Sequence, residues 1–180
     1  MNGDLLETVN WTWGLSLVVL TIAIHATGVV VLAFVTSRIR VRLASRRLGL
    51  RYMLPIVIGL VAAAGLLLAV LHGIEAASWA AAYLWLGALD SPLPALLYSV
   101  DSMSTRGASG LTLQGHWRMI GALEAVDGML LFGISTAFIF ALMHSFWPTL
   151  SVTDTPRIAY PSRSNKRSDA GLGRGWREER

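Results

Sequence analysis

Hydrophobic residues are concentrated in three long runs that polar segments separate. Residues 14–36 and residues 52–74 each form a run of 23 residues without a charged side chain. The third run, 119–147, is apolar except for Glu124, Asp127 and His144. A helix of 23 residues is about 34 Å long, enough to cross a hydrocarbon core of about 30 Å. The pattern therefore predicts three membrane-spanning helices.

The segment between the second and third runs does not have the pattern of an exposed loop. Residues 75–89 continue the second helix, and Pro92 and Pro94 are placed to end it and to start another. Residues 95–105 predict a short amphipathic helix, and residues 105–110 a Gly-rich turn. Irregular backbone at membrane depth must be buried in protein or line a water-filled cavity. We expect a re-entrant loop, and an oligomer around a shared axis, because one such loop cannot enclose a cavity.

Composition supports a membrane protein. Of the 180 residues, 54% are hydrophobic and 14% are charged, against about 25% charged in soluble domains. The absence of cysteine excludes a disulfide scaffold or a thiolate metal site. Thirteen of the 15 Lys and Arg residues lie in 37–51 and 148–180. The positive charge therefore indicates topology, and no motif for binding nucleic acid is present.

The charge distribution predicts the orientation. Residues 37–51 contain six Arg and no acidic residue, which places this segment in the cytoplasm. The acidic N-terminus then lies outside, and the tail lies in the cytoplasm. Asp4 and Glu7 precede the first run without any Lys or Arg, and the run is too long for a signal peptide, so we interpret it as a retained span.

Three regions follow from these patterns. Residues 1–51 hold the first span and the basic cytoplasmic loop, and residues 52–147 hold the two later spans with the short helix and loop between them. Residues 148–180 are rich in Ser, Arg, Pro and Gly, which predicts a disordered tail. Its basic residues either contact anionic lipid head groups or stay solvated.

Several segments of residues 72–143 form a recognisable series. They are HGIE (72–75) with Trp79 and Tyr83, PALLYS (94–99), WRMIGALEA (117–125), GMLLFG (128–133) and STAF (135–138). This series resembles bacterial members of the pore-loop ion-channel family, the potassium-channel-like proteins with two helices around a pore loop.

The resemblance implies an all-α membrane protein with three transmembrane helices and a re-entrant pore helix and loop between the second and third. It implies a homotetramer that contacts the lipids of the bacterial inner membrane and passes inorganic ions through its pore. It also implies no enzymatic activity, no cofactor and no metal site. The filter-like segment would be Thr105, Arg106, Gly107, Ala108, Ser109 and Gly110. Family filters are of the TTVGYGD kind, so only Thr105 and Gly107 match. A carbonyl filter needs glycine at unusual backbone angles, so these departures argue against potassium selectivity.

Arg106 is the most informative departure. A ring of arginines repels cations, and anion pores use such rings. A buried charge needs a partner, and Asp101, Glu124 and Asp127 are available. We consider two placements: Arg106 points behind the filter into these three acids, which then support the filter, or it faces the pore.

Other residues allow alternative functions. Gly107–Gly110 fits the G-x-S-G pattern of rhomboid-type serine proteases, with Ser109 as nucleophile and His144 or His116 as base. A non-conducting or regulatory channel relative is a further alternative.

Polar residues and glycines within the predicted spans have competing interpretations. His72 and Glu75 form a polar pair on the second helix, with spacing that suits either a hydrogen-bonded bracket or a metal. We expect His25 to be an interhelical donor rather than a proton relay. Gly128 and Gly133 are either gating bends or close packing positions. We interpret most of the seven Trp and four Tyr as interfacial anchors.

Overall fold

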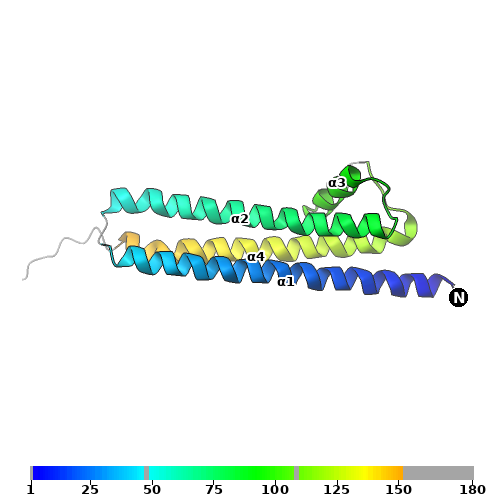
Figure 1. The fold of residues 1–180 in the computed structure, drawn as a ribbon, viewed down its shortest axis with the longest axis horizontal. Coiled ribbons are helices and arrows are strands. Elements are labelled where there is room, and N and C mark those ends of the chain that lie inside the picture. Colours follow the sequence, from blue (N-terminus) through cyan, green and yellow to red (C-terminus); the bar gives the residue numbers. More distant parts are fainter. Residues whose placement is uncertain (1, 47–48, 108–109, 152–180) are drawn as a thin grey trace, which may run out of the picture.

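The computed structural model describes residues 2–46, 49–107 and 110–151, and this part of the chain is helical with no strand (Figure 1). Three long helices, α1 (Asn2–Ala44), α2 (Leu50–Trp85) and α4 (Arg118–Ser151), lie side by side. A short helix, α3 (Pro92–Met103), and a single 3-10 turn, η1 (Gly115–Trp117), lie between α2 and α4 in the sequence.

All three long helices are long and apolar enough to cross a membrane. Their outward surfaces carry large apolar side chains such as Val19, Leu66 and Phe140, each at least two-thirds exposed. Such a surface suits a lipid environment, because lipid tails contact apolar side chains without the free-energy cost of exposing them to water. The prediction of an all-α chain with three helices that could span a membrane is therefore confirmed for the described residues.

α3 packs against α2 and α4 at the end of the bundle where α1 begins (Figure 1). Pro92 stands at its first position, where a missing N–H costs nothing, as the sequence predicts. Its buried face donates hydrogen bonds to both neighbours, from Ser99 to the Ala76 carbonyl at 2.8 Å and from Ser102 to the Gly121 carbonyl at 3.1 Å. α3 is therefore fixed between two long helices.

The chain after α3 has left-handed backbone at several positions. Thr105, Gly107 and Gly110 have φ angles of 58°, 77° and 82°. Thr105 is notable because a β-branched residue rarely adopts positive φ. The backbone N–H of Arg106 donates to the Asp101 carbonyl at 3.0 Å, which closes the chain back onto the last turn of α3. Ala108 and Ser109 lie outside the described residues.

The C-terminal end of α4 differs slightly from the sequence prediction. The predicted tail begins at residue 148, but α4 continues through Pro148 to Ser151. Residues 152–180, the rest of the predicted disordered tail, lie outside the described residues.

Candidate functional site

A row of polar side chains runs along the interior of the three-helix bundle. Six of them are fully buried, and they come from all four α-helices: Thr21, His25, Glu75, Ser99, Glu124 and Asp127. Buried polar groups are costly unless they are hydrogen-bonded, so their partners define what the site can do.

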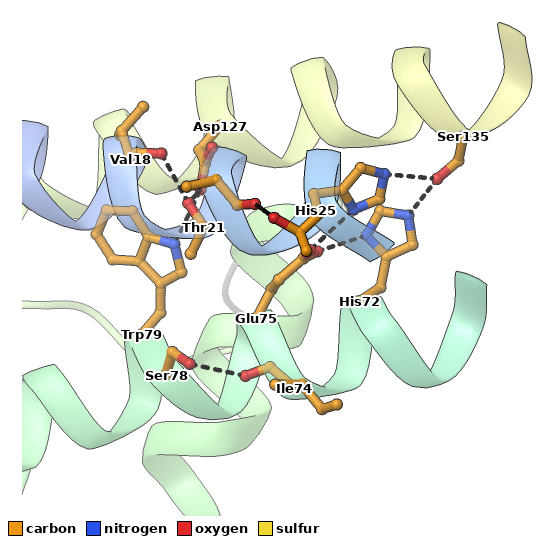
Figure 2. A network of polar contacts seen from close by, with 12 residues as sticks. Val18, Thr21, His25, His72, Ile74, Glu75, Ser78, Trp79, Asp127 and Ser135 are labelled. Carbon is orange, nitrogen blue, oxygen red and sulfur yellow. Dashed lines mark hydrogen bonds and ion pairs between the residues drawn. The ribbon is translucent and has the colours of Figure 1, made fainter. Parts of the chain in front are cut away.

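The first part of the row is a closed ring of four side chains, His25 from α1, His72 and Glu75 from α2, and Ser135 from α4 (Figure 2). His25 Nδ1 lies 2.8 Å from Glu75 Oε1, and His72 Nδ1 lies 3.2 Å from Glu75 Oε2. On the opposite edges of the two imidazoles, both Nε2 atoms lie 3.1 Å from the Ser135 hydroxyl. We call these four side chains the His–Glu–Ser ring.

Asp127 of α4 forms the next contact along the row (Figure 2). Its Oδ2 atom accepts hydrogen bonds from the Thr21 hydroxyl at 2.6 Å and from the Trp79 indole at 3.0 Å. One carboxylate therefore joins α1, α2 and α4.

Glu124 forms the last part, at the α3 end of the bundle. The Tyr83 hydroxyl donates to Glu124 Oε2 at 2.6 Å, and the Ser99 hydroxyl hydrogen-bonds to Oε1. Glu124 thus connects α2, α3 and α4. Its predicted role as support for a filter is not tested, but it does hold the helix that precedes the filter-like segment.

Arg106 does not join these acids. Its side chain is 73% exposed, and its Nη1 lies 3.6 Å from Asp101 Oδ1. Glu124 and Asp127 are fully buried and take their hydrogen bonds from other residues. Of the three acids considered as buried partners of Arg106, only Asp101 contacts it, and the Arg106 side chain in that contact is largely exposed.

The interpretation of the aromatic residues as interfacial anchors is wrong for Trp79 and Tyr83. Both are fully buried, and both donate hydrogen bonds to carboxylates of α4. Tyr98 of α3 packs edge-on against Tyr83, with ring centroids 5.3 Å apart. Burial, with a smaller contribution from the charge of Glu124, raises the pKa of the Tyr98 hydroxyl, so it stays neutral at physiological pH.

The two glycines of α4 that were considered as gating bends have different surroundings. Gly128 faces the end of α3, and a Cβ added there would lie 2.6 Å from the Met103 Cα. Gly133 has no atom within 4 Å of such a Cβ. Gly128 is therefore a close-packing position, while the gating role of both residues stays a prediction.

The protease constellation is not assembled by the described residues. Ser109 lies outside them. His144 is exposed and stacks on Phe140, 6.1 Å between ring centroids.

The His–Glu–Ser ring is the place where a metal ion would be considered. His25, His72 and Glu75 present ligand atoms within 4.8 Å of one another. Two ligand atoms on one tetrahedral zinc are about 3.3 Å apart, given bonds of about 2.0 Å. The 2.8 Å between His25 Nδ1 and Glu75 Oε1 is the length of a hydrogen bond. We therefore assign a hydrogen bond to this pair, while the choice between a bracket and a metal site for His72 and Glu75 stays a prediction.

Five residues of this row were not predicted as site residues: Thr21, Trp79, Tyr83, Ser99 and Ser135. The last four lie in the segments that carry the family resemblance, where no role was assigned to them. The available signal for Thr21 and Ser135 was their polarity within apolar spans, which marks functional candidates in membranes. His25 is an interhelical hydrogen-bonding residue, as expected.

No protein-family model, curated protein or solved structure matches this chain. The resemblance to the potassium-channel-like family therefore remains a prediction.

Proposed function

We propose that the chain is one subunit of an oligomeric pore-loop channel that passes inorganic ions across a bacterial inner membrane. The observation that carries the proposal is α3, a 12-residue helix that is too short to span and packs between two spans. A strained, left-handed segment follows it directly. In a membrane, such backbone needs a water-filled cavity or protein around it, and four copies around an axis supply both.

The firm attachment of α3 supports this proposal. A selectivity filter works by holding backbone carbonyls at fixed positions, so the helix before it must not move. Here Ser99 and Ser102 hydrogen-bond α3 to both neighbouring spans, and Gly128 lets the α3 backbone approach α4 closely. Three independent contacts therefore hold the base of the loop.

Arg106 bears on which ions pass. Its exposed side chain supports the pore-facing placement, since its nearest carboxylate is 3.6 Å away and itself partly exposed. Four such side chains around an axis would create a positive potential, which attracts anions and repels K⁺. We therefore propose a pore that is not potassium-selective and that admits anions.

The test is ion flux through the purified protein in liposomes, with K⁺, Na⁺ and Cl⁻ compared in one preparation. We expect a conductance whose anion-to-cation permeability ratio, measured from reversal potentials in asymmetric KCl, falls in Arg106→Ala. Arg118→Ala is the matched control, because Arg118 is also exposed but begins α4 outside the filter-like segment. Its ratio should equal that of the wild type.

Two outcomes would contradict the proposal at different points. Absence of flux for all three ions would favour the non-conducting relative. Flux with an unchanged ratio in Arg106→Ala would show that Arg106 does not face the pore.

A further inference from the structure

The hydrogen bonds of the His–Glu–Ser ring leave two of its atoms unused. His25 Nδ1 lies 2.8 Å from Glu75 Oε1, and the Nε2 atoms of His25 and His72 each lie 3.1 Å from the Ser135 hydroxyl. The fourth contact, between His72 Nδ1 and Glu75 Oε2 at 3.2 Å, does not have the geometry of a hydrogen bond. Both of its atoms are buried and have no hydrogen-bond partner among the described residues.

The partners of each atom assign the protons of the ring. A neutral imidazole carries one N–H, a serine hydroxyl donates once, and an ionised carboxylate only accepts. His25 therefore donates from Nδ1 to Glu75 and accepts at Nε2 from Ser135. The Ser135 oxygen in turn accepts from His72 Nε2. His72 Nδ1 is then a bare lone pair that faces a bare carboxylate oxygen.

A metal ion satisfies two lone pairs that converge in a buried site. Imidazole nitrogen and carboxylate oxygen are both ligands of Zn²⁺ and related transition metals, whereas Mg²⁺ and Ca²⁺ prefer oxygen ligands. The 3.2 Å between His72 Nδ1 and Glu75 Oε2 agrees with the separation of about 3.3 Å between two ligands of one tetrahedral ion. We propose that His25, His72 and Glu75 form a binding site for a divalent transition-metal ion.

His25 supplies the third ligand after a change of tautomer. With its proton on Nε2, its Nδ1 lone pair faces the same space as those of His72 and Glu75. Ligand atoms of the three residues lie within 4.8 Å of one another, so side-chain shifts of about 1–2 Å bring them around one ion. Both imidazoles stay neutral and Glu75 stays ionised, so this change needs no group to gain or lose a proton.

Ser135 is placed to hold the two imidazoles in the metal-binding tautomer. A histidine that binds a metal through one nitrogen usually donates its other N–H to an acceptor, which fixes the ring. The Ser135 oxygen has two lone pairs and can accept from both Nε2 atoms, which face it in Figure 2. The serine proton then turns to the backbone carbonyl four residues earlier, a common partner for serine within a helix. Ser135 is therefore a positioning residue of the site.

The charge of the surroundings favours a divalent cation. Glu75 is fully buried, and so is Asp127, which lies next to the ring along the row (Figure 2). No Lys or Arg is buried among the residues whose side chains the structure describes. Buried carboxylates are costly unless they are paired or bind a metal. An ion in the ring would offset this cost and would fasten α1 to α2, with α4 attached through Ser135.

The test is a zinc titration of protein that is purified without a histidine tag and stripped of metal with EDTA. In detergent, wild type should bind one equivalent of Zn²⁺ per chain, and an excess of Mg²⁺ should not displace it. Co²⁺ in place of Zn²⁺ should give visible d–d absorption bands. The melting temperature should rise with the Zn²⁺ concentration, because the unfolded chain lacks the assembled site.

Substitutions locate the ion. Glu75→Gln and His72→Gln each remove a ligand, so the Zn²⁺ affinity should fall by more than about 100-fold and the Co²⁺ bands should be lost. Ser135→Ala keeps all three ligands and should lower the affinity by about 10–100-fold, the usual effect of losing such a partner. His144→Gln is the control, because it removes an exposed imidazole outside the ring. Its affinity should equal that of wild type.

Two results would overturn the proposal. One is wild-type protein that takes up no stoichiometric Zn²⁺, a result that needs no variant to fold. The other is equal Zn²⁺ affinity in wild type and the ligand variants, which would place the ion elsewhere. If Glu75→Gln does not fold, His72→Gln decides the location, because His72 lies at the edge of the ring and is 14% exposed. Zinc binding and ion flux are measured separately, so the site does not depend on whether the protein conducts ions.

Discussion

At the scale of single residues, the carboxylates of the bundle serve as acceptors that join helices. Glu124 receives a hydrogen bond from Tyr83 of α2 and contacts the Ser99 hydroxyl of α3, while Asp127 receives hydrogen bonds from Trp79 of α2 and from α1. A buried acceptor that loses a donor keeps its desolvation cost without compensation. Removal of one donor should therefore lower the free energy of unfolding by more than the net contribution of a single hydrogen bond.

Removal of the Tyr83 hydroxyl tests this arrangement. We expect Tyr83→Phe to lower the free energy of unfolding by about 1–3 kcal/mol, because Glu124 loses a donor in a fully buried site. Equilibrium unfolding in mixed detergent measures the loss. Tyr98→Phe is the control, since it removes the same atom from a half-buried tyrosine and keeps the Tyr83–Glu124 bond. Equal losses in both variants would show that the Glu124 bond adds nothing.

The sequence indicates which residues of the row are acidic but not how they are paired. Glu124 and Asp127 are spaced to share a face of one helix, and that much follows from three-residue spacing. Their donors depend on how far each long helix is rotated about its axis, which packing between helices determines. Arg106 is the clearest case, because the sequence left a buried and a pore-facing placement open and the structure leaves its side chain largely exposed.

At the scale of elements, the positions of the helices and of their breaks follow from the sequence. Apolar runs give the central parts of α1, α2 and α4, and two prolines give the start of α3, because these features act locally. The helices extend beyond the apolar runs, and α1 is the clearest case, because it covers Asn2–Ala44 where the run covers residues 14–36. The attachment of α3 to α4 is not local. It depends on Gly128, where the α4 backbone meets the end of α3 with no room for a side chain.

Substitution of this glycine tests the attachment. Gly128→Ala places a methyl group against the Met103 backbone, so we expect a loss of about 1–3 kcal/mol from overpacking. Gly133→Ala is the matched control on the same helix, with open space around its added methyl group. It should be neutral or stabilising by up to about 1 kcal/mol, since alanine favours a helix. A Gly128→Ala protein as stable as Gly133→Ala would mean that α3 moves away freely.

At the scale of the whole molecule, the bundle has two different ends. The basic segment 37–51 includes the connection from α1 to α2, and the C-terminal end of α4 lies at that same end (Figure 1). The α2–α3 connection and the start of α1 lie at the opposite end. This is the arrangement that three successive spans of alternating direction produce, as the predicted topology requires. One orientation experiment therefore determines the location of both ends.

Cysteine labelling can measure that orientation, since the chain has no cysteine of its own. Ser45 and Asp90 are exposed residues at opposite ends of the bundle, at the α1–α2 and α2–α3 connections. The excess of arginine beside Ser45 predicts that its end faces the cytoplasm. In intact cells, a membrane-impermeant maleimide should therefore modify Asp90→Cys and leave Ser45→Cys unmodified until the membrane is permeabilised. The reverse pattern would place Arg106 and the filter-like segment on the cytoplasmic side, opposite to the predicted orientation.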